Sequence, residues 1–335
     1  MGTLRLLRST DLAHDCSAAL RSFVCYCESR NLSPETTAWY SRRVGRFLSF
    51  ATQRELTPGS TTRQHLREFL AGLPPTVTPP TRNGYRRAVR AFFGYLVREG
   101  ELPDNPAAGV EKAREIRRQP AVLSAEQLRS LLRQPIRARF TGARDHALLC
   151  LLADTGCRIS EALGIRLGDV NWPQSVVTVL GKGGKERLLP LGNQVRLALR
   201  RYLDKRGEAC EQDLLFVTRT GSRVTARHAH RSMQRYARAA GIEGRGSPHT
   251  LRYSFAVSWL RAGGDVITLQ RVLGHSSLQM VNHYAVLAAA DVQAAHRRWS
   301  PVDRLAGHQT APYAQMNLYR AGGWHRGEGN RQRAV

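Results

Sequence analysis

The chain lacks long apolar runs and has few cysteines for its length. Its most apolar stretch, HALLCLLADTG over residues 146–156, is well short of the roughly 18 residues that a membrane-spanning helix needs. Six cysteines occur among 335 residues, and none forms a C-x-x-C pair. A membrane-spanning protein, a disulfide framework and a zinc site are therefore not expected. We expect free thiols in apolar helices, no metal and no other cofactor.

Acidic residues are also scarce. The sequence has 26 Asp and Glu against 51 Lys and Arg, which gives a formal net charge of +25. Such an excess favours a nucleic-acid partner, because each neutralised phosphate releases condensed counterions. Charge alone leaves open an anionic membrane surface or a merely solvated basic surface. The opening MGTLRLLRSTDL mixes arginine with aspartate and does not resemble a signal peptide, so we expect a cytoplasmic, nucleoid-associated protein that does not bind membranes.

The first third of the chain has the apolar periodicity of helices. We expect four of them, the second beginning at Ser33–Pro34, a favourable helix start. The predicted helical stretches are residues 15–30, 31–53, 61–73 and 78–100. A break follows at LPDNPAAG, and we place a domain boundary near Arg117–Val122.

The rest of the chain has a mixed pattern. Ser124 and Gln127 have the spacing of a capping box, and the apolar helix that follows is expected to turn at Thr155–Gly156. SVVTVLGKGGKERLLPL, residues 175–191, predicts a β-hairpin with a glycine-rich turn. Helices dominate from Asn193 onward. The fold class is mainly α with a small β-hairpin or sheet (α+β). The expected division is 1–116 for a helical domain, 122–300 for a mixed domain and 301–335 for a basic, poorly ordered tail.

Two predicted helices carry arginines at intervals of four residues. Like charges at this spacing repel one another mildly in an isolated helix, so a bound anion would relieve the strain. Two such faces, one in each domain, fit a clamp that closes on a duplex and contacts its phosphates. A solvated face is the alternative for either one. The residues are Arg82, Arg86, Arg87 and Arg90 in the first domain, and Arg227, Arg231 and Arg235 in the second.

Four short motifs carry candidate chemistry: TGCRISE, GKGGKER, HTLRY and LGHSSLQMVNHY. Together they resemble the tyrosine recombinases, which include phage-type integrases and Xer-like recombinases. The resemblance spans nearly the whole chain and is strongest from Leu148 to Trp299. It implies a helical core-binding domain of the SAM-like type before a catalytic domain. It also favours a simple recombinase, Xer-like or transposon-encoded, without an extra N-terminal arm-binding domain.

The resemblance implies a complete catalytic set, with a supporting acidic residue at Glu161. Its members are Arg158, Lys182, His249, Arg252, His275 and the nucleophile Tyr284. It implies a site-specific recombinase that cuts and rejoins DNA through a 3′-phosphotyrosyl intermediate without metal or ATP. The implied assembly is a homotetramer on two double-stranded sites, or a pairing with a related recombinase, held by a C-terminal segment docked on a neighbour.

The residue types suit phosphoryl transfer. Two arginines can bind the non-bridging oxygens of a phosphodiester in bidentate fashion and remain charged at any working pH. An unperturbed phenol, with a pKa of about 10, is a poor nucleophile at pH 7, and we expect nearby cations to lower the pKa of Tyr284. His249 can accept its proton, and Lys182 can protonate the leaving 5′ oxygen. His275 is expected at the start of a helix, where backbone N–H groups favour a phosphate.

Each of these residues alone has an ordinary structural explanation, such as an ion-paired arginine, a turn lysine or a core tyrosine. The chain also departs from the family pattern at Tyr253 and Ser258, where histidines are usual. Tyr253 is thus a rival nucleophile, as are Tyr313 and Tyr319. Two other functions stay open: an inactive DNA-binding protein of the same fold, and a type IB topoisomerase.

Overall fold

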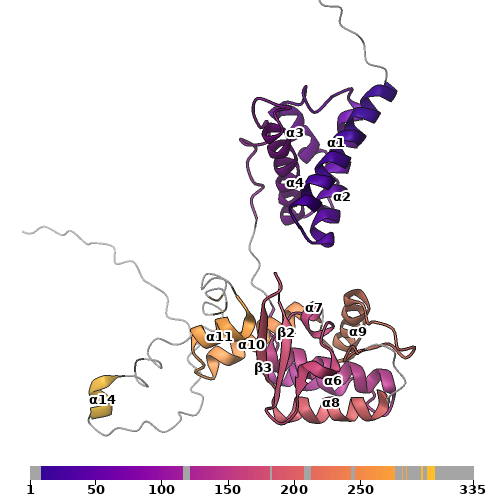
Figure 1. Cartoon of the computed structure of the whole chain (residues 1–335). Helices are drawn as coiled ribbons and strands as arrows, with labels where there is room; N and C mark the ends of the chain where they lie inside the picture. The colour runs from indigo at the N-terminus through magenta and orange to yellow at the C-terminus, as the bar shows by residue number, and fades with distance from the viewer. Residues whose placement is uncertain are drawn as a thin grey trace, which may run out of the picture. The chain divides into compact units, whose positions relative to one another are not determined.

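The computed structural model divides the chain into two compact units, Met1–Arg118 and Gln119–Val335, each with its own hydrophobic core (Figure 1). The side chains of residues 9–14, 303 and 304 are not described. The residues whose structure is described are 9–115, 121–181, 183–206, 213–242, 246–275, 281, 284, 296 and 300–305.

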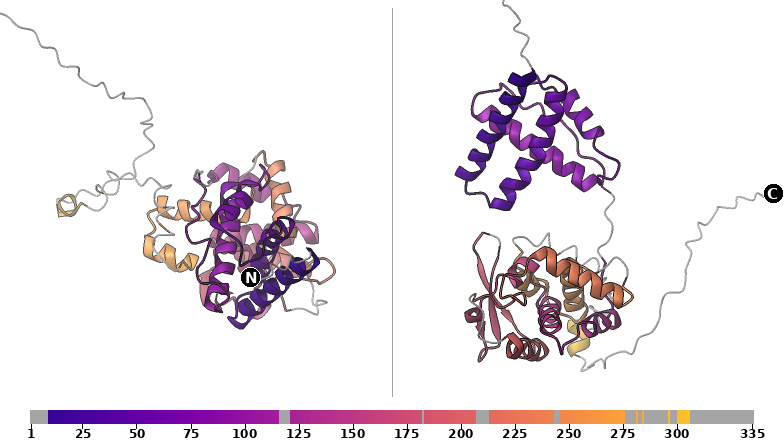
Figure 2. Two further views of the ribbon diagram at one scale, coloured as in Figure 1. Left: turned by 90° about the horizontal axis from the view of Figure 1, so that it is seen from above. Right: turned by 90° about the vertical axis from the view of Figure 1, so that its right-hand side faces the viewer.

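Over residues 9–115, the first unit forms four helices, as the sequence predicts (Figure 2). α1 packs on α2, and α2 and α3 pack on α4, around a core rich in fully buried phenylalanines. The predicted start of α2 is confirmed, since the Ser33 hydroxyl accepts a hydrogen bond from the Thr36 N–H and Pro34 opens the helix. The bounds are α1 Ser9–Ser29, α2 Pro34–Gln53, α3 Arg63–Ala71 and α4 Pro79–Arg98.

The second unit is built around α6, which packs against α5, α8, α9 and α10. α6 is buried on nearly all sides, which explains its apolar sequence without a polar face. The predicted capping box at Ser124 and Gln127 is confirmed at the start of α5. The helices are α5 Ala125–Arg133, α6 Phe140–Thr155, α7 Ile159–Ala162, the short 3-10 helix η1 Leu167–Asp169, α8 Asn193–Arg206, α9 Ala226–Ala239, α10 Pro248–Arg261, α11 Val266–Leu273 and α14 Pro301–Leu305.

A small antiparallel sheet lies at one side of these helices, as the right-hand view of Figure 2 shows. Its strands β1 (Val170–Asn171), β2 (Val176–Leu180) and β3 (Glu186–Pro190) pair in sequence order. The predicted hairpin is confirmed as β2 and β3, whereas the two-residue β1 was not predicted. In the hairpin register Val179 lies opposite Arg187, and both belong to the face that carries the buried Leu189.

Three further expectations concern the chain as a whole. Cys16, Cys27, Cys150 and Cys157 are buried free thiols as predicted, while Cys25 is exposed. No helix in the described part of the chain is both long and apolar enough to cross a membrane. α14 begins at Pro301, where proline suits the first turn of a helix. The remaining tail, 306–335, lies outside the described residues.

The turn after α6 provides a test of the packing around Gly156. Gly156 has φ +61°, and an added Cβ would lie 2.4 Å from Phe255 Cδ1 and 2.9 Å from Leu273 Cδ2. Gly241 has φ +70°, and no described atom outside its own neighbours lies within 4 Å of such a Cβ. Both Gly→Ala variants acquire the left-handed backbone penalty of about 1–2 kcal/mol. We expect Gly156→Ala to cost at least about 1 kcal/mol more, because it overpacks the core. Calorimetric unfolding of both variants measures the difference, and equal destabilisation would contradict it.

Candidate active site

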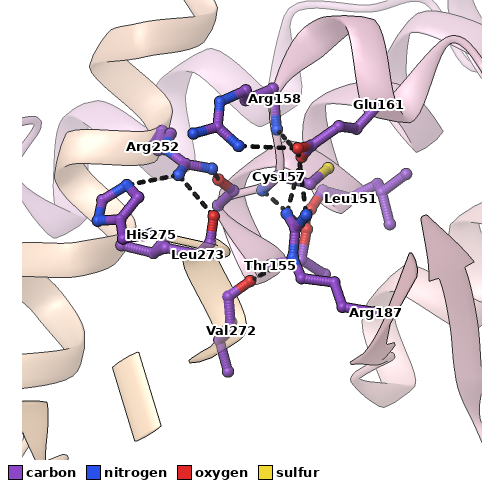
Figure 3. Close-up of polar contacts among 11 residues, drawn as sticks. Leu151, Thr155, Cys157, Arg158, Glu161, Arg187, Arg252, Val272, Leu273 and His275 are labelled. Atoms are coloured by element: carbon purple, nitrogen blue, oxygen red, sulfur yellow. Dashed lines mark hydrogen bonds and ion pairs between the residues drawn. The ribbon is translucent and has the colours of Figure 1, made fainter. Parts of the chain in front are cut away.

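Arg158 lies at the turn between α6 and α7, where the left-handed Gly156 redirects the chain. It is the N-cap residue of α7, and its backbone N–H donates to Glu161 Oε2 at 2.7 Å. Its guanidinium donates through Nη1 to Glu161 Oε1 at 2.9 Å (Figure 3). The side chain is 32% exposed, so part of the guanidinium faces solvent. The predicted supporting carboxylate therefore holds Arg158 in place from one turn away.

Glu161 is itself buried, with a side chain 3% exposed, and it has a second arginine partner. Arg187 donates to both carboxylate oxygens, through Nη2 to Oε2 at 2.7 Å and through Nη1 to Oε1 at 3.1 Å. Burial acts to raise the pKa of the Glu161 carboxyl, but hydrogen bonds from Arg187 and Arg158 outweigh it, so the pKa lies below its usual value. Glu161 is an ionised carboxylate at neutral pH.

Arg187 is not among the site residues predicted from the sequence, although it lies in the GKGGKER motif. The available signal was the alternation of the strand. Arg187 falls two residues before the buried Leu189 and opposite the buried Val179, so a charged side chain occupies an inward-facing position. A half-buried arginine at such a position requires an acceptor, and the acidic residue of the TGCRISE motif provides it.

Arg252 is a buried arginine of α10, 5% exposed, whose guanidinium contacts two backbone carbonyls, His275 and Tyr284. Nη1 donates to the Gly156 carbonyl at 2.7 Å, and Nη2 donates to the Leu273 carbonyl at 2.7 Å. Nη2 also lies 2.7 Å from His275 Nε2. Burial, followed by the charge of Arg158, lowers the pKa of Arg252, consistent with two cations gathered in one place. The two arginines are thus drawn together from segments 94 residues apart.

His275 follows directly after Gly274, the left-handed C-cap of α11. Burial and the charges of Arg252, Arg158 and Arg187 lower the pKa of its imidazole to about 4. The ring is therefore neutral at pH 7, and Nε2 accepts from Arg252, which leaves the proton on Nδ1. Nδ1 is buried and has no hydrogen-bond partner among the described residues. The predicted helix start after His275 falls on residues 276–280, outside the described residues.

Tyr284 lies beside this pair and is 5% exposed. Its ring stacks on His275 with centroids 5.8 Å apart and planes at 12°, and it contacts the ring of Tyr253 at 5.0 Å. The expectation of a lowered pKa is wrong in this state. Burial raises the pKa of the Tyr284 hydroxyl, although Arg252, and to a smaller extent Arg158, act to lower it as predicted. The hydroxyl is protonated at neutral pH.

The two remaining members of the predicted set differ in what can be said of them. His249 lies in the first turn of α10 and is exposed. Partial loss of water around its ring, and the charges of Arg252 and Arg158, lower its pKa, so the imidazole is neutral and can accept a proton. Lys182 lies outside the described residues. The turn that carries it has positive φ at Gly183 (79°) and Gly184 (75°).

The arginines of α4 fall into two classes. Arg82 donates to the Leu70 carbonyl and Arg86 donates through Nε to the Val110 carbonyl, and both are half-buried. Arg87 and Arg90 are exposed, with the Arg87 guanidinium 4.9 Å from the Trp39 ring centroid. Arg82 and Arg86 therefore stabilise the fold, whereas Arg87 and Arg90 are accessible to an anion.

The three predicted arginines of α9 are all exposed, and the helix that carries them is anchored from beneath. The Tyr236 hydroxyl donates to Asp145 Oδ2 at 2.9 Å, and Asp145 is paired with Arg144 at 2.7 Å in the interior. Arg144 also approaches His228 at 3.4 Å. Arg227, Arg231 and Arg235 thus lie on a helix whose inner face is fixed by a buried polar network. No group of three potential metal ligands occurs among the described residues.

The pKa of His275 generates a prediction about pH. Because this pKa lies below the unfolded value of about 6.5, between pH 6.5 and 4 the unfolded chain binds a proton that the folded chain does not. This group is therefore expected to remove about 2 kcal/mol of stability between pH 7 and pH 5. His275→Gln keeps an acceptor for Arg252 but cannot titrate, so its stability falls less over the same interval.

Urea unfolding of both proteins at pH 7 and pH 5 measures the difference. His146 and His249, whose pKa values are also lowered, titrate in both proteins and cancel in the comparison. Equal pH sensitivity of the two proteins, or an NMR titration of His275 near pH 6.5, would overturn the assignment.

Comparisons with known proteins cover most of the chain. Residues 121–291 match the sequence profile described as "Phage integrase family", and residues 20–100 match "Phage integrase, N-terminal SAM-like domain". Over 269 residues the chain is 33% identical to tyrosine recombinase XerC of Pelobacter propionicus. This alignment covers 79% of this chain and 89% of that protein. Over 293 residues it is 31% identical to tyrosine recombinase XerD of Chlorobaculum tepidum, covering 84% and 96%.

Solved structures agree in fold. The XerH site-specific recombinase bound to a palindromic difH substrate superposes with a TM-score of 0.68 at 22% identity, covering 88% of this chain and 85% of that chain. The Tn1549 transposon integrase in complex with circular intermediate DNA gives a TM-score of 0.65 at 20% identity, covering 83% and 98%. The predicted class, mainly helical with a small sheet, is confirmed.

Proposed function

The chain belongs to the phage integrase family of tyrosine recombinases, and we propose that Tyr284 is the nucleophile with which it breaks and rejoins DNA strands at defined sites. The observation that carries this proposal is the meeting of Arg252, His275 and Tyr284 in one contact set, linked to Arg158 through the Gly156 turn. Residues 1–116 would be the core-binding domain and 122–300 the catalytic domain of this site-specific recombinase.

The proposed reaction forms one phosphorus–oxygen bond and breaks another. The Tyr284 oxygen attacks the phosphorus, its proton passes to His249, and the bond to the 5′ oxygen breaks with a proton supplied by Lys182. Arg158 and Arg252 neutralise the charge that develops on the non-bridging oxygens, and the Nδ1–H of His275 is a further donor. The 3′-phosphotyrosyl ester keeps the bond energy for rejoining, so neither metal nor ATP is consumed.

Bound DNA must change the resting arrangement. Tyr284 is buried and protonated, and Arg252 is occupied by two carbonyls and an imidazole. A phosphate bound to the exposed part of Arg158 would also lie near Arg252. It would compete with the two carbonyls and the imidazole for the Arg252 guanidinium. The free chain is therefore a state in which the nucleophile is withheld until substrate arrives.

The proposed number of protomers rests on the number of DNA strands that are cut. Exchange between two duplexes requires four strands to be cut, and each cut links one tyrosine to a 3′ phosphate until that strand is rejoined, so four protomers would be needed. We propose a homotetramer, or a tetramer shared with a related recombinase, acting on double-stranded sites. Because DNA is the substrate, we place the protein in the cytoplasm with the nucleoid.

Tyr284→Phe tests the nucleophile. On a nicked duplex that carries the cognate half-sites and traps the cleaved strand, we expect the unmodified protein to form an SDS-resistant adduct through a 3′ phosphate. Tyr284→Phe should form none, because only the attacking oxygen is removed. Tyr253→Phe is the matched control, since that ring packs on Tyr284, and its adduct should persist. An adduct with Tyr284→Phe, or none with the unmodified protein, would overturn the proposal; the latter would leave a DNA-binding protein.

The two classes of arginine give a second test. Replacing Arg227, Arg231 and Arg235 together by glutamine should weaken DNA binding and reduce the slope of log affinity against log salt by about 1 for each phosphate that is no longer neutralised. Arg87→Gln with Arg90→Gln should behave in the same way.

Arg82→Gln with Arg86→Gln is the control for these variants. These two side chains bond to backbone carbonyls, so their removal should lower the unfolding temperature of the first unit and leave the salt slope nearly unchanged. Fluorescence anisotropy across a salt series measures the slopes. A slope unaffected by the α9 substitutions would exclude that face from DNA contact.

A further inference from the structure

We propose that Arg187 is a positioning residue of the catalytic site, one that sets the hairpin bearing Lys182 against Arg158 and His275. The inference rests on the proposed function, because it assigns Lys182 the protonation of the leaving oxygen. Arg187 is not among the six predicted catalytic positions. Its guanidinium nevertheless joins its own motif, GKGGKER, to the acidic residue of TGCRISE and to the residue that directly precedes LGHSS (Figure 3).

All three nitrogens of the Arg187 guanidinium are used. Nη1 and Nη2 form a fork on the Glu161 carboxylate, and Nε donates to the Val272 carbonyl at 2.9 Å. Val272 lies in the last turn of α11, two residues before Gly274. The strand β3 is thereby fixed both to the turn of Arg158 and to the segment that delivers His275. The planar fork of arginine makes these three bonds at once, which a lysine cannot do.

The backbone at Gly274 is fitted to the same guanidinium. A Cβ at this position would lie 2.9 Å from Arg187 Nη1 and 3.1 Å from its Cζ. Gly274 also has φ +64°, which favours glycine independently. The turn before His275 therefore packs directly on Arg187, and movement of the guanidinium would be transmitted to the imidazole.

Charge gives Arg187 a second effect on the site. Glu161 is the described carboxylate that pairs with both Arg158 and Arg187. Because Arg187 occupies both carboxylate oxygens, Arg158 shares only one of them through its side chain and keeps part of its guanidinium exposed. Without Arg187, the carboxylate would be free to draw Arg158 into a bidentate pair and away from a phosphate.

The competing explanation is that the Arg187–Glu161 ion pair only stabilises the fold. A substrate with a different leaving group distinguishes this explanation from a role in positioning Lys182. When sulfur replaces the bridging 5′ oxygen of the scissile phosphate, Tyr284 forms the same phosphorus–oxygen bond while the phosphorus–sulfur bond breaks. The departing thiolate is stable at neutral pH and needs no proton, so the contribution of Lys182 is bypassed. A residue that positions Lys182 should matter much less on this substrate than on ordinary DNA.

The experiment measures adduct formation by full-length Arg187→Gln on matched oxygen and sulfur duplexes. General acid catalysis contributes about 100-fold or more, so we expect the rate to fall by at least about 100-fold on the oxygen substrate and by about 10-fold or less on the sulfur substrate. Lys182→Met should show the same contrast. Arg187→Lys, which keeps the charge and one hydrogen bond, should recover part of the rate on oxygen.

Arg144→Gln is the matched control, because Arg144 is also a buried, carboxylate-paired arginine. It lies on the first turns of α6, about 18 Å along the helix from the Gly156 turn. It should lower the folded fraction and reduce both rates by the same factor.

The possible outcomes distinguish failure of this inference from failure of the proposed recombinase function. Equal effects of Arg187→Gln on the two substrates, full activity of this variant, or no sulfur rescue of Lys182→Met would each overturn the role of Arg187 in positioning Lys182. Absence of an adduct with the unmodified protein on both substrates would instead overturn the proposed function.

Discussion

A single buried carboxylate organises the site. Glu161 accepts from the backbone and side chain of Arg158 and from the fork of Arg187, and its side chain is 3% exposed. A carboxylate so far from water is stable only when its lone pairs are satisfied by donors. The same bonds fix the α6–α7 turn to β3, and a separate bond from Arg187 Nε to the Val272 carbonyl fixes β3 to the end of α11. Removal of this one charge would leave two arginines without their common partner.

Around this carboxylate the positive charge is in excess. Arg158, Arg187 and Arg252 gather near one acid, and the cations help to hold His275 neutral, with its pKa lowered to about 4. Arg252 binds carbonyl dipoles and an imidazole nitrogen in place of a second carboxylate. Neutral acceptors orient a guanidinium without cancelling its charge, so the site retains the positive potential that a phosphodiester requires.

Sequence reasoning succeeded where chemistry is local. The Ser33–Pro34 helix start, the Ser124 capping box and the glycine turn after α6 follow from the bonds that those residues make with their own neighbours. It failed where the answer depends on distant packing. In the sequence Arg187 is an ordinary strand residue, because its partners Glu161 and Val272 are distant along the chain. Arg82 and Arg86 likewise have the same spacing as Arg90, and only the fold shows that they bind backbone carbonyls.

The pKa of Tyr284 shows most clearly why proximity of charge is not sufficient. The sequence places cations near the hydroxyl and so predicts an acidic phenol, and the cations do act in that direction. Burial among Leu269, Leu273 and Val281 acts in the other direction and is larger, because a phenolate pays a solvation penalty that a protonated hydroxyl does not. The two effects respond differently to substrate. In the proposed reaction, moving the ring out of its apolar contacts would relieve burial while the arginines stay nearby, so exposing the Tyr284 hydroxyl would also lower its pKa.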